Sequence, residues 1–155
     1  MTAIDLSPIL RKIRRRYPEW WRSEPALRCL RQVWAGANCN DAGVFEDFET
    51  VRIDLEGEKQ WHAELTLATA PNGWHAVSAS YLYPTGGGGS LPSVWDRVAF
   101  TSRHEAIAHA IEGLIASYER VRGSAYAPET QARTASRMLE TLRGYRQSTK
   151  QLSLF

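Results

Sequence analysis

Two histidines and a glutamate within residues 103–109 are of the types that bind and activate a metal ion. A zinc-protease helix places two histidines four residues apart, so that both lie on one face beside a catalytic glutamate. Here His104 and His109 are five residues apart, which is about 140° around a helix. Ser102, followed three residues later by Glu105, instead predicts a capping box at the start of a helix. We therefore expect no metal site and no metal catalysis.

No other set of residues in the sequence has the types and spacing of an active site. Cys29 and Cys39 lack the short spacing of zinc ligands and are expected to be free thiols. The glycine-rich stretch 84–93 lacks the lysine and hydroxyl residue of a phosphate-binding loop. We expect a loop without regular structure there, because glycine loses much conformational freedom on folding and proline lacks an N–H donor. The sequence thus predicts a non-enzymatic protein with no cofactor and no small-molecule substrate.

A basic segment, LRKIRRRYPEWWR at residues 10–22, has residue types that bind nucleic acids. Its helical part is expected to have five cations on the outer face, next to two tryptophans. Cationic groups contact phosphates, and indole rings stack on bases. This candidate nucleic-acid site consists of Arg11, Lys12, Arg14, Arg15, Arg16, Trp20 and Trp21. A second interpretation stays open, in which the helix is only solvated and the tryptophans pack on a sheet.

Aromatic residues on the predicted strands form another possible surface for bases. The alternation of side chains along a strand places some of them on the sheet face away from the long helix. We expect the N-terminal helices to cover that face. The residues concerned are Trp61, His62, Trp74, His75, Tyr81 and Tyr83.

The final stretch, STKQLSLF, has apolar side chains that are either packed on the protein's own core or kept for a partner. Gln151, Leu152, Ser153, Leu154 and Phe155 resemble, in this order, the short linear motif by which bacterial polymerases, repair proteins and initiation regulators bind the replicative sliding clamp. The resemblance covers these five residues and implies nothing about the folded part.

The resemblance implies a role for four of the five motif residues. Leu154 and Phe155 are expected to fill the hydrophobic cleft of the clamp, since a flexible peptide needs large apolar anchors to offset its ordering entropy. Leu152 adds apolar contact, Gln151 forms a hydrogen bond at the rim, and Ser153 has no anchoring role. The competing interpretation is that the tail closes the protein's own core.

Two short helices are predicted in the first forty residues. Ser7 as the N-cap, followed by Pro8, predicts the start of the first helix. Ser23 predicts the start of the second helix, and Gly36 predicts its end.

From residue 50 the apolar residues alternate with polar ones, which predicts antiparallel strands at 50–55, 60–68 and 74–83. A fourth strand is expected within residues 94–100. The helix after Ser102 has a broad apolar face, formed by Ala106, Ile107, Ala110, Ile111, Leu114, Ile115 and Tyr118. A last helix is expected from about Pro128, with a polar tether after Gly144.

These elements predict an α+β fold: an N-terminal helical pair, a three- to four-stranded antiparallel meander, a long amphipathic helix packed on the sheet, and a C-terminal helix with a flexible tail. We expect one domain over residues 1–146, comprising a basic helical segment at 1–40, sheet plus helix at 50–122, and a C-terminal helix at 128–146. Residues 147–155 are expected to form the flexible tail with the motif.

The net charge of +2 conceals an uneven distribution, because residues 1–40 have eight basic and three acidic groups. Such asymmetry favours an acidic or polyanionic partner. The sequence therefore predicts an accessory protein that binds the sliding clamp and acts in or interferes with DNA replication or repair, as phage and mobile-genetic-element proteins do. The alternative is a nucleic-acid-binding module whose tail packs on its own core. DNA is the second expected partner. We expect a cytoplasmic protein, associated with the nucleoid through the clamp, and no contact with a membrane.

Overall fold

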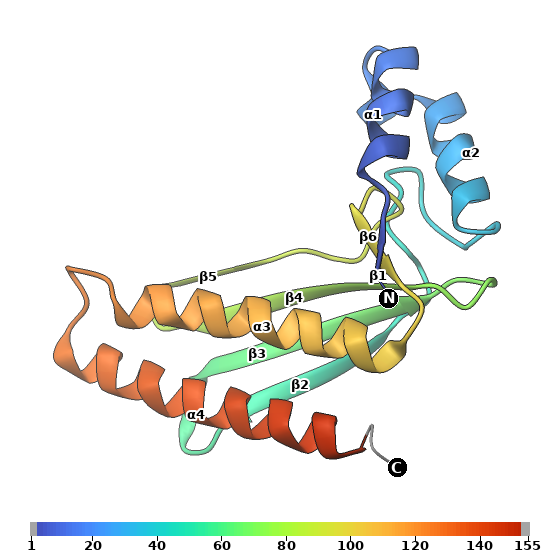
Figure 1. Cartoon of the computed structure of the whole chain (residues 1–155). Coiled ribbons are helices and arrows are strands. Elements are labelled where there is room, and N and C mark those ends of the chain that lie inside the picture. Colours follow the sequence, from blue (N-terminus) through green and yellow to red (C-terminus); the bar gives the residue numbers. More distant parts are fainter. Residues whose placement is uncertain (1–2, 153–155) are drawn as a thin grey trace. The chain divides into compact units, whose positions relative to one another are not determined.

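The computed structural model describes the backbone of residues 3–152 and the side chains of residues 3–149. Its elements confirm the predicted α+β class (Figure 1). In chain order they are β1 (Ala3–Asp5), α1 (Ser7–Arg16), a 3₁₀ turn η1 (Trp20–Arg22), α2 (Glu24–Val33), β2 (Glu49–Leu55), β3 (Glu58–Thr69), β4 (His75–Tyr83), β5 (Gly86–Gly89), β6 (Val98–Phe100), α3 (Arg103–Arg122) and α4 (Glu129–Leu152).

The strands form a six-stranded antiparallel sheet in the order β1-β6-β4-β3-β2, with β5 paired to β4. The predicted three-strand meander is confirmed as β2, β3 and β4. Gly57 and Gly73 stand at its two turns with φ angles of 78° and 86°. Glycine suits both positions, because a Cβ atom strains the left-handed conformation.

Contacts within the chain form two compact units, and the expected single domain over residues 1–146 stays a prediction. Unit 1 comprises the residues up to 49, 66–78 and 91–106. Unit 2 comprises 50–65, 79–90 and the residues from 107 onward. Strands β3 and β4 therefore each contribute residues to both units.

The core of unit 1 is built around Trp34, which is completely buried. Its ring packs edge-on against Phe45 and Trp74, and its Nε1–H donates to the Val94 carbonyl oxygen at 3.2 Å. Burial of a tryptophan is favourable when the indole N–H finds such a partner. Helices α1 and α2 add aliphatic side chains to this core, namely Leu10, Ile13, Ala26, Leu27 and Leu30.

The two helix starts of unit 1 differ in how they are capped. The predicted cap at Ser23 is confirmed, because its hydroxyl accepts a hydrogen bond from the Ala26 N–H at 3.3 Å. The predicted cap at Ser7 is wrong by one residue: Leu6 is the N-cap of α1 and offers no side-chain hydrogen bond. The Asp5 carboxylate accepts the Ser7 N–H at 2.9 Å instead.

In unit 2, α3 and α4 lie side by side on one face of the strands (Figure 1). All seven residues of the predicted apolar face of α3 are buried. Tyr118 joins this helix to the strands, because its hydroxyl donates to the carbonyl oxygens of His62 at 2.8 Å and Leu82 at 3.0 Å. Burial raises the pKa of Tyr118 to about 12, so the hydroxyl keeps its proton.

The expectation of no regular structure at residues 84–93 is wrong, because Gly86–Gly89 forms β5 against β4. A Cβ atom on Gly87 would stand 2.4 Å from the Tyr81 carbonyl oxygen, and one on Gly89 would stand 2.3 Å from the Ser80 Cβ. The absence of side chains therefore permits a close approach that outweighs the entropic cost of ordering glycine. Strand β6 is also shorter than expected, and β1 was not predicted.

Helix α4 continues beyond the point where the sequence predicted a polar tether. It passes through Gly144 and ends at Leu152, so residues 147–152 are helical. Its side chains Ala135, Met138, Leu139 and Leu142 are buried. Hydroxyl groups after Gly144 bond back along the helix, as in Thr149 Oγ1 to the Tyr145 carbonyl oxygen at 2.9 Å. The residues after Gly144 are polar because this part of the helix is largely exposed, and their polarity does not end the helix.

Candidate nucleic-acid interface

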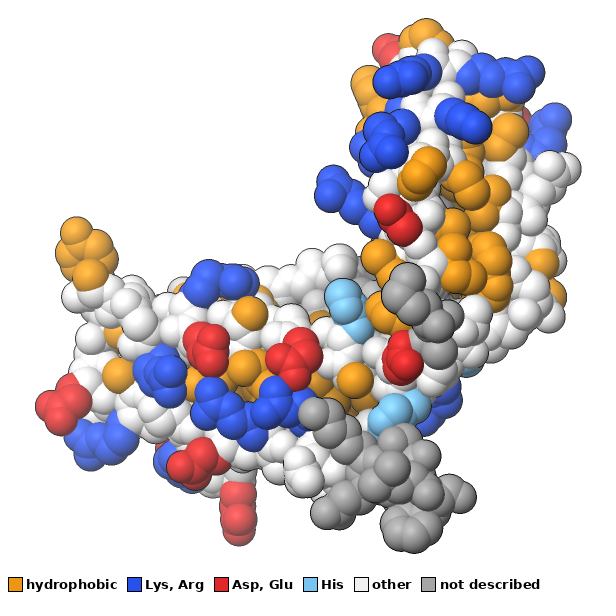
Figure 2. Space-filling model, in the orientation of Figure 1, with side chains coloured by type: hydrophobic (Ala, Val, Ile, Leu, Met, Phe, Trp, Pro, Cys, Tyr) orange, Lys and Arg blue, Asp and Glu red, His pale blue; other side chains and the backbone are white. Residues whose placement is uncertain are grey.

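Helix α1 has one face in the core of unit 1 and the other in solvent. Leu10 and Ile13 are buried, whereas the five predicted cations are all exposed. Figure 2 shows Lys and Arg side chains gathered over α1 and α2. The predicted outer face of Arg11, Lys12, Arg14, Arg15 and Arg16 is therefore confirmed, while its role in binding nucleic acid stays a prediction.

A further cation, Arg97, lies beside the start of α1. The pairing of β1 with β6 aligns Asp5 with Val98. One residue further along each strand, the Leu6 N–H donates to the Arg97 carbonyl oxygen at 2.7 Å. Sequence reasoning missed Arg97 because the strand that brings it to α1 was itself not predicted.

Arg97 and two cations of α1 surround a small cavity in unit 1. Its volume is about 240 Å³, and its lining residues are Ser7, Leu10, Arg11, Arg14 and Arg97. Guanidinium groups match the geometry of phosphate and carboxylate oxygens and bind them through paired hydrogen bonds. The cavity therefore has the chemistry of an anion site.

Tryptophans adjoin the cavity through Arg14, whose guanidinium carbon lies 4.3 Å from the Trp20 ring centroid. The Trp20 ring is 4.7 Å from the Trp95 ring and 5.6 Å from the Trp21 ring, which stands nearly perpendicular to it. Trp21 is 60% exposed. Trp20 is thus part of a small aromatic cluster, while Trp21 keeps most of its surface in solvent. The packing of both rings on a sheet, the second interpretation, is not observed.

The acidic groups near the N-terminal helical pair have hydrogen-bond partners other than these six cations. Hydrogen bonds from Ser7, and to a smaller extent the charge of Arg11, lower the pKa of the Asp5 carboxyl. Glu19 accepts from Arg22 at 2.8 Å, and Glu24 from Arg28 at 3.3 Å. Among residues 3–149, by contrast, no ion pair within 4.0 Å involves any of Arg11, Lys12, Arg14, Arg15, Arg16 or Arg97.

Arginines of α4 show the opposite behaviour in unit 2. Ion pairs join Arg137 to Glu58 at 3.4 Å, Arg143 to Glu119 at 3.1 Å, and Arg146 to Glu112. Each pair connects α4 to a strand end or to α3. These three cations are locally neutralised, so the described side chains of α4 have less uncompensated charge than those of α1.

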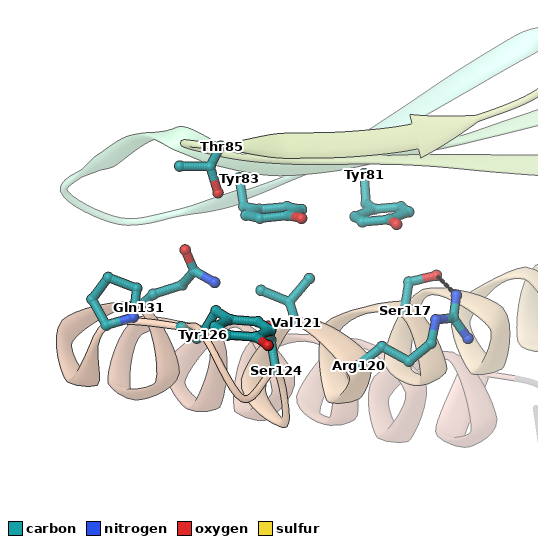
Figure 3. A pocket seen from close by; sticks show the side chains of 11 residues that line it. Tyr81, Tyr83, Thr85, Ser117, Arg120, Val121, Ser124, Tyr126 and Gln131 are labelled. Atoms are coloured by element: carbon teal, nitrogen blue, oxygen red, sulfur yellow. Dashed lines mark hydrogen bonds between the residues drawn. The ribbon is translucent and has the colours of Figure 1, made fainter.

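A larger pocket of about 540 Å³ lies within unit 2 (Figure 3). Tyr81 and Tyr83 point from β4 toward α3, with their ring planes nearly parallel and their centroids 6.2 Å apart. Arg120 is the one charged residue among the described lining residues, and its guanidinium donates to the Ser117 hydroxyl at 3.1 Å. The pocket is aromatic and polar but has little free positive charge.

The strand aromatics do not form the base-stacking surface that the sequence left open. The Trp61 and Tyr81 rings both contact Tyr118 of α3, so these residues lie on the helix side of the strands. Tyr83 packs against Trp61, and Trp74 belongs to the core of unit 1. Trp61, Tyr81 and Tyr83 are therefore not among the residues on the sheet face away from the helix, since alternation sets which residues share a face but not which face the helices cover.

Residues 103–109 form the first two turns of α3. The Ser102 hydroxyl accepts the Glu105 N–H at 3.3 Å, which confirms the cap. His104 is half-buried and His109 exposed. Across the described part of the chain, no group of three His, Cys, Asp or Glu residues lies close enough to hold a metal ion. Cys29 and Cys39 are free thiols, as expected.

The stretch that resembles a clamp-binding motif begins inside α4. Gln151 and Leu152 are the last residues of the helix, whereas Leu154 and Phe155 lie outside the described residues. Leu142 is the last buried residue of the described side chains, and Arg143 to Thr149 are half-buried or exposed. The buried face of α4 thus fades before the motif begins.

No protein-family model matches the chain, and no curated protein or solved structure is significantly similar to it. Over residues 3–152, no helix is both long and apolar enough to cross a membrane. Function is therefore inferred from the residues themselves.

Proposed function

We propose that this chain is a non-enzymatic accessory protein that binds a bacterial sliding clamp through Gln151, Leu152, Leu154 and Phe155. The observation behind the proposal is the order of the five motif residues, which agrees with the clamp-binding motif at every position. Docking on the clamp would bring the protein to replication forks or repair sites, or would let it compete with polymerases for the ring.

The described part of α4 supports this proposal in two ways. Its core contacts end at Leu142, so the following residues have less apolar packing to hold them against unit 2. Arg143 and Arg146, which precede the motif, bind Glu119 and Glu112 of α3. These contacts anchor the helix upstream of the motif and leave the motif's apolar side chains as candidates for a partner.

A variant of the full chain tests the proposal. Replacement of both Leu154 and Phe155 by alanine should weaken binding to a purified bacterial clamp by about 50-fold or more, because paired apolar anchors dominate such peptide contacts. Ser153→Ala is the matched control and should change the affinity by less than about 3-fold, since this residue has no anchoring role. Binding is measured by calorimetry or fluorescence anisotropy.

Thermal unfolding of the same variants separates the proposal from tail packing. If the tail binds the clamp, the melting temperature stays within about 2 °C of the parent chain. Truncation of buried anchors would instead cost about 2–5 kcal/mol and lower the melting temperature clearly. That loss, or clamp affinity that survives the double replacement, contradicts the proposal.

A second function, binding of nucleic acid by unit 1, is favoured by the ion-pair pattern. Six cations on and beside α1 have no ion-pair partner within 4.0 Å among the described residues, whereas Glu19 and Glu24 are paired with Arg22 and Arg28. Such a field attracts polyanions and releases their counterions on binding. The test is oligonucleotide affinity against salt: a steep decrease between about 50 and 200 mM supports the function, and no binding at about 50 mM contradicts it.

A further inference from the structure

Three features of unit 1 adjoin one another: the arginine cavity, the Trp20 ring and the exposed Trp21 ring. Arg14 links them, because it lines the cavity and also lies over the Trp20 ring at 4.3 Å. Trp20 in turn contacts Trp21 at a centroid distance of 5.6 Å. An anion in the cavity would therefore have an exposed aromatic face in its neighbourhood.

We propose that the Arg11, Arg14 and Arg97 cavity binds a phosphodiester group of a single-stranded nucleic acid whose neighbouring base stacks on Trp21. The proposal rests on the second proposed function, nucleic-acid binding by unit 1, and adds the site and the class of strand. It also assigns a binding role to Arg97, which lies outside the basic helix.

Charge and hydrogen bonding favour a phosphodiester as the occupant. Three arginines line a cavity of about 240 Å³, and no acidic residue is among its described lining residues. Asp96, the acidic neighbour of Arg97, turns toward the backbone and accepts the Ser93 N–H at 3.1 Å. The Asp5 carboxylate accepts the Ser7 N–H at the start of α1, and the nearby charge of Arg11 also lowers the pKa of Asp5. Asp5 thus compensates Arg11 in part, whereas no ion pair within 4.0 Å among the described residues involves Arg14 or Arg97.

The tryptophans favour a single strand over a duplex. Bases of a duplex are stacked on each other, and their faces are not accessible to a side chain. In a single strand each base offers a free face next to its phosphate, so a cationic groove beside an aromatic ring binds it with little sequence preference. Trp21, at 60% exposure, has the free surface that such stacking needs.

The test uses the full chain and a labelled oligothymidine of about fifteen nucleotides, with a duplex of equal length for comparison. The oligothymidine should bind at least about 5-fold more tightly than the duplex, because only the single strand stacks on Trp21. Arg97→Gln should weaken oligothymidine binding about 5- to 20-fold and reduce the slope of log affinity against log salt by about 0.7. Trp21→Ala should weaken it about 5-fold or more at unchanged salt slope.

Arg28→Gln is the matched control, since Arg28 is an exposed arginine of α2 already paired with Glu24. It should change the affinity by less than about 2-fold. Arg11→Gln is a second cavity variant and should reproduce the effect of Arg97→Gln, so the test does not depend on one variant folding well.

The outcomes separate the site from the broader function. If the parent chain binds oligothymidine and both Arg97→Gln and Arg11→Gln bind it equally tightly, the cavity site is overturned. The broader proposal of nucleic-acid binding by unit 1 is then left intact. Equal affinity for duplex and single strand, with no effect of Trp21→Ala, overturns the single-strand assignment. No binding of either oligonucleotide at about 50 mM salt overturns both proposals.

Discussion

Helices α1 and α4 are both rich in arginine, but they differ in what the arginines contact. In α4 the side chains of Arg137, Arg143 and Arg146 bind glutamates that lie 79, 24 and 34 residues away in the sequence. In α1 the cations have no such partner among the described residues. A cluster of arginines in the sequence therefore does not indicate a binding surface until their acidic partners in the structure are known.

The difference concerns function more than stability. Exposed ion pairs such as those of α4 contribute little to the free energy of unfolding, because water screens both charges. Their effect is to cancel the local field. The field of α1 is cancelled less than that of α4, so unit 1 is the part of the chain expected to attract a polyanion, while α4 leads to the proposed clamp-binding residues.

The largest expected effect on nucleic-acid affinity comes from removing the arginines of the cavity, in contrast to removing the paired arginines of α4. Replacement of Arg11, Arg14 and Arg97 by glutamine should weaken oligothymidine binding about 100-fold at about 50 mM salt and lower the salt slope by about 2. Replacement of Arg137, Arg143 and Arg146 by glutamine should change the affinity by less than about 3-fold, because these charges are already compensated. The measurement is fluorescence anisotropy over a salt series.

Equal losses of affinity in the two triple variants would contradict the contrast between α1 and α4, since binding would then depend on net charge alone. Circular dichroism of both variants serves as the control for folding. Both variants are expected to fold, because four of the six arginines are exposed and the other two, Arg143 and Arg146, are half-buried.

A smaller effect is expected from Asp96 of unit 1, which is the acidic neighbour of Arg97 in the sequence. Burial raises the pKa of Asp96 to about 6. The folded chain then binds this proton more tightly than the unfolded chain, so the contribution of Asp96 to stability falls as the pH rises from about 4 to about 6. Asp96→Asn should remove this dependence and raise the free energy of unfolding at neutral pH by about 1–2 kcal/mol.

Urea unfolding at pH values of about 4.5 and 7 measures the effect. Asp47→Asn is the control, because this carboxylate is exposed and should give no comparable change. A parent-like pH dependence in Asp96→Asn would show that ionisation of this carboxylate does not limit the stability of unit 1.

The smallest effect concerns the continuity of α4. Gly144 lies inside the helix, with open space where a Cβ atom would stand. Gly144→Ala should therefore raise the free energy of unfolding by about 0.5–1 kcal/mol. Gly57→Ala offers a matched contrast, since that position is equally open but has a φ of 78° and should lose about 1 kcal/mol. Stabilisation by Gly57→Ala, or destabilisation by Gly144→Ala, would contradict the assigned backbone conformations.

Local patterns in the sequence were sufficient for much of the fold. Alternation from residue 50 predicted the meander, and the apolar face after Ser102 predicted α3 with its seven buried residues. Periodicity succeeds in these segments because each has one face in a core and the other in water. Ser23 was recognisable as a cap because its partner, Ala26, lies only three residues away in the sequence.

Long-range pairing explains what the sequence did not predict. The three residues of β1 form a strand only because β6, about 95 residues later, lies beside them. The four glycines of β5 have low strand propensity and pair with β4 because a close approach requires them. Arg97 joins the candidate site through the first of these pairings, so no local pattern identifies it. The motif at Gln151 was found by resemblance alone.

One crossed binding experiment tests the central claim, which is that unit 1 binds nucleic acid and the residues from Gln151 onward bind the clamp. The parent chain, the Arg11, Arg14 and Arg97 triple-glutamine variant, and the Leu154 and Phe155 double-alanine variant are each titrated with oligothymidine and with a purified bacterial clamp. The account predicts that the triple variant loses the oligonucleotide about 100-fold and keeps the clamp, and that the double variant loses the clamp about 50-fold and keeps the oligonucleotide. Loss of both ligands in either variant, or retention of both in either, would contradict it.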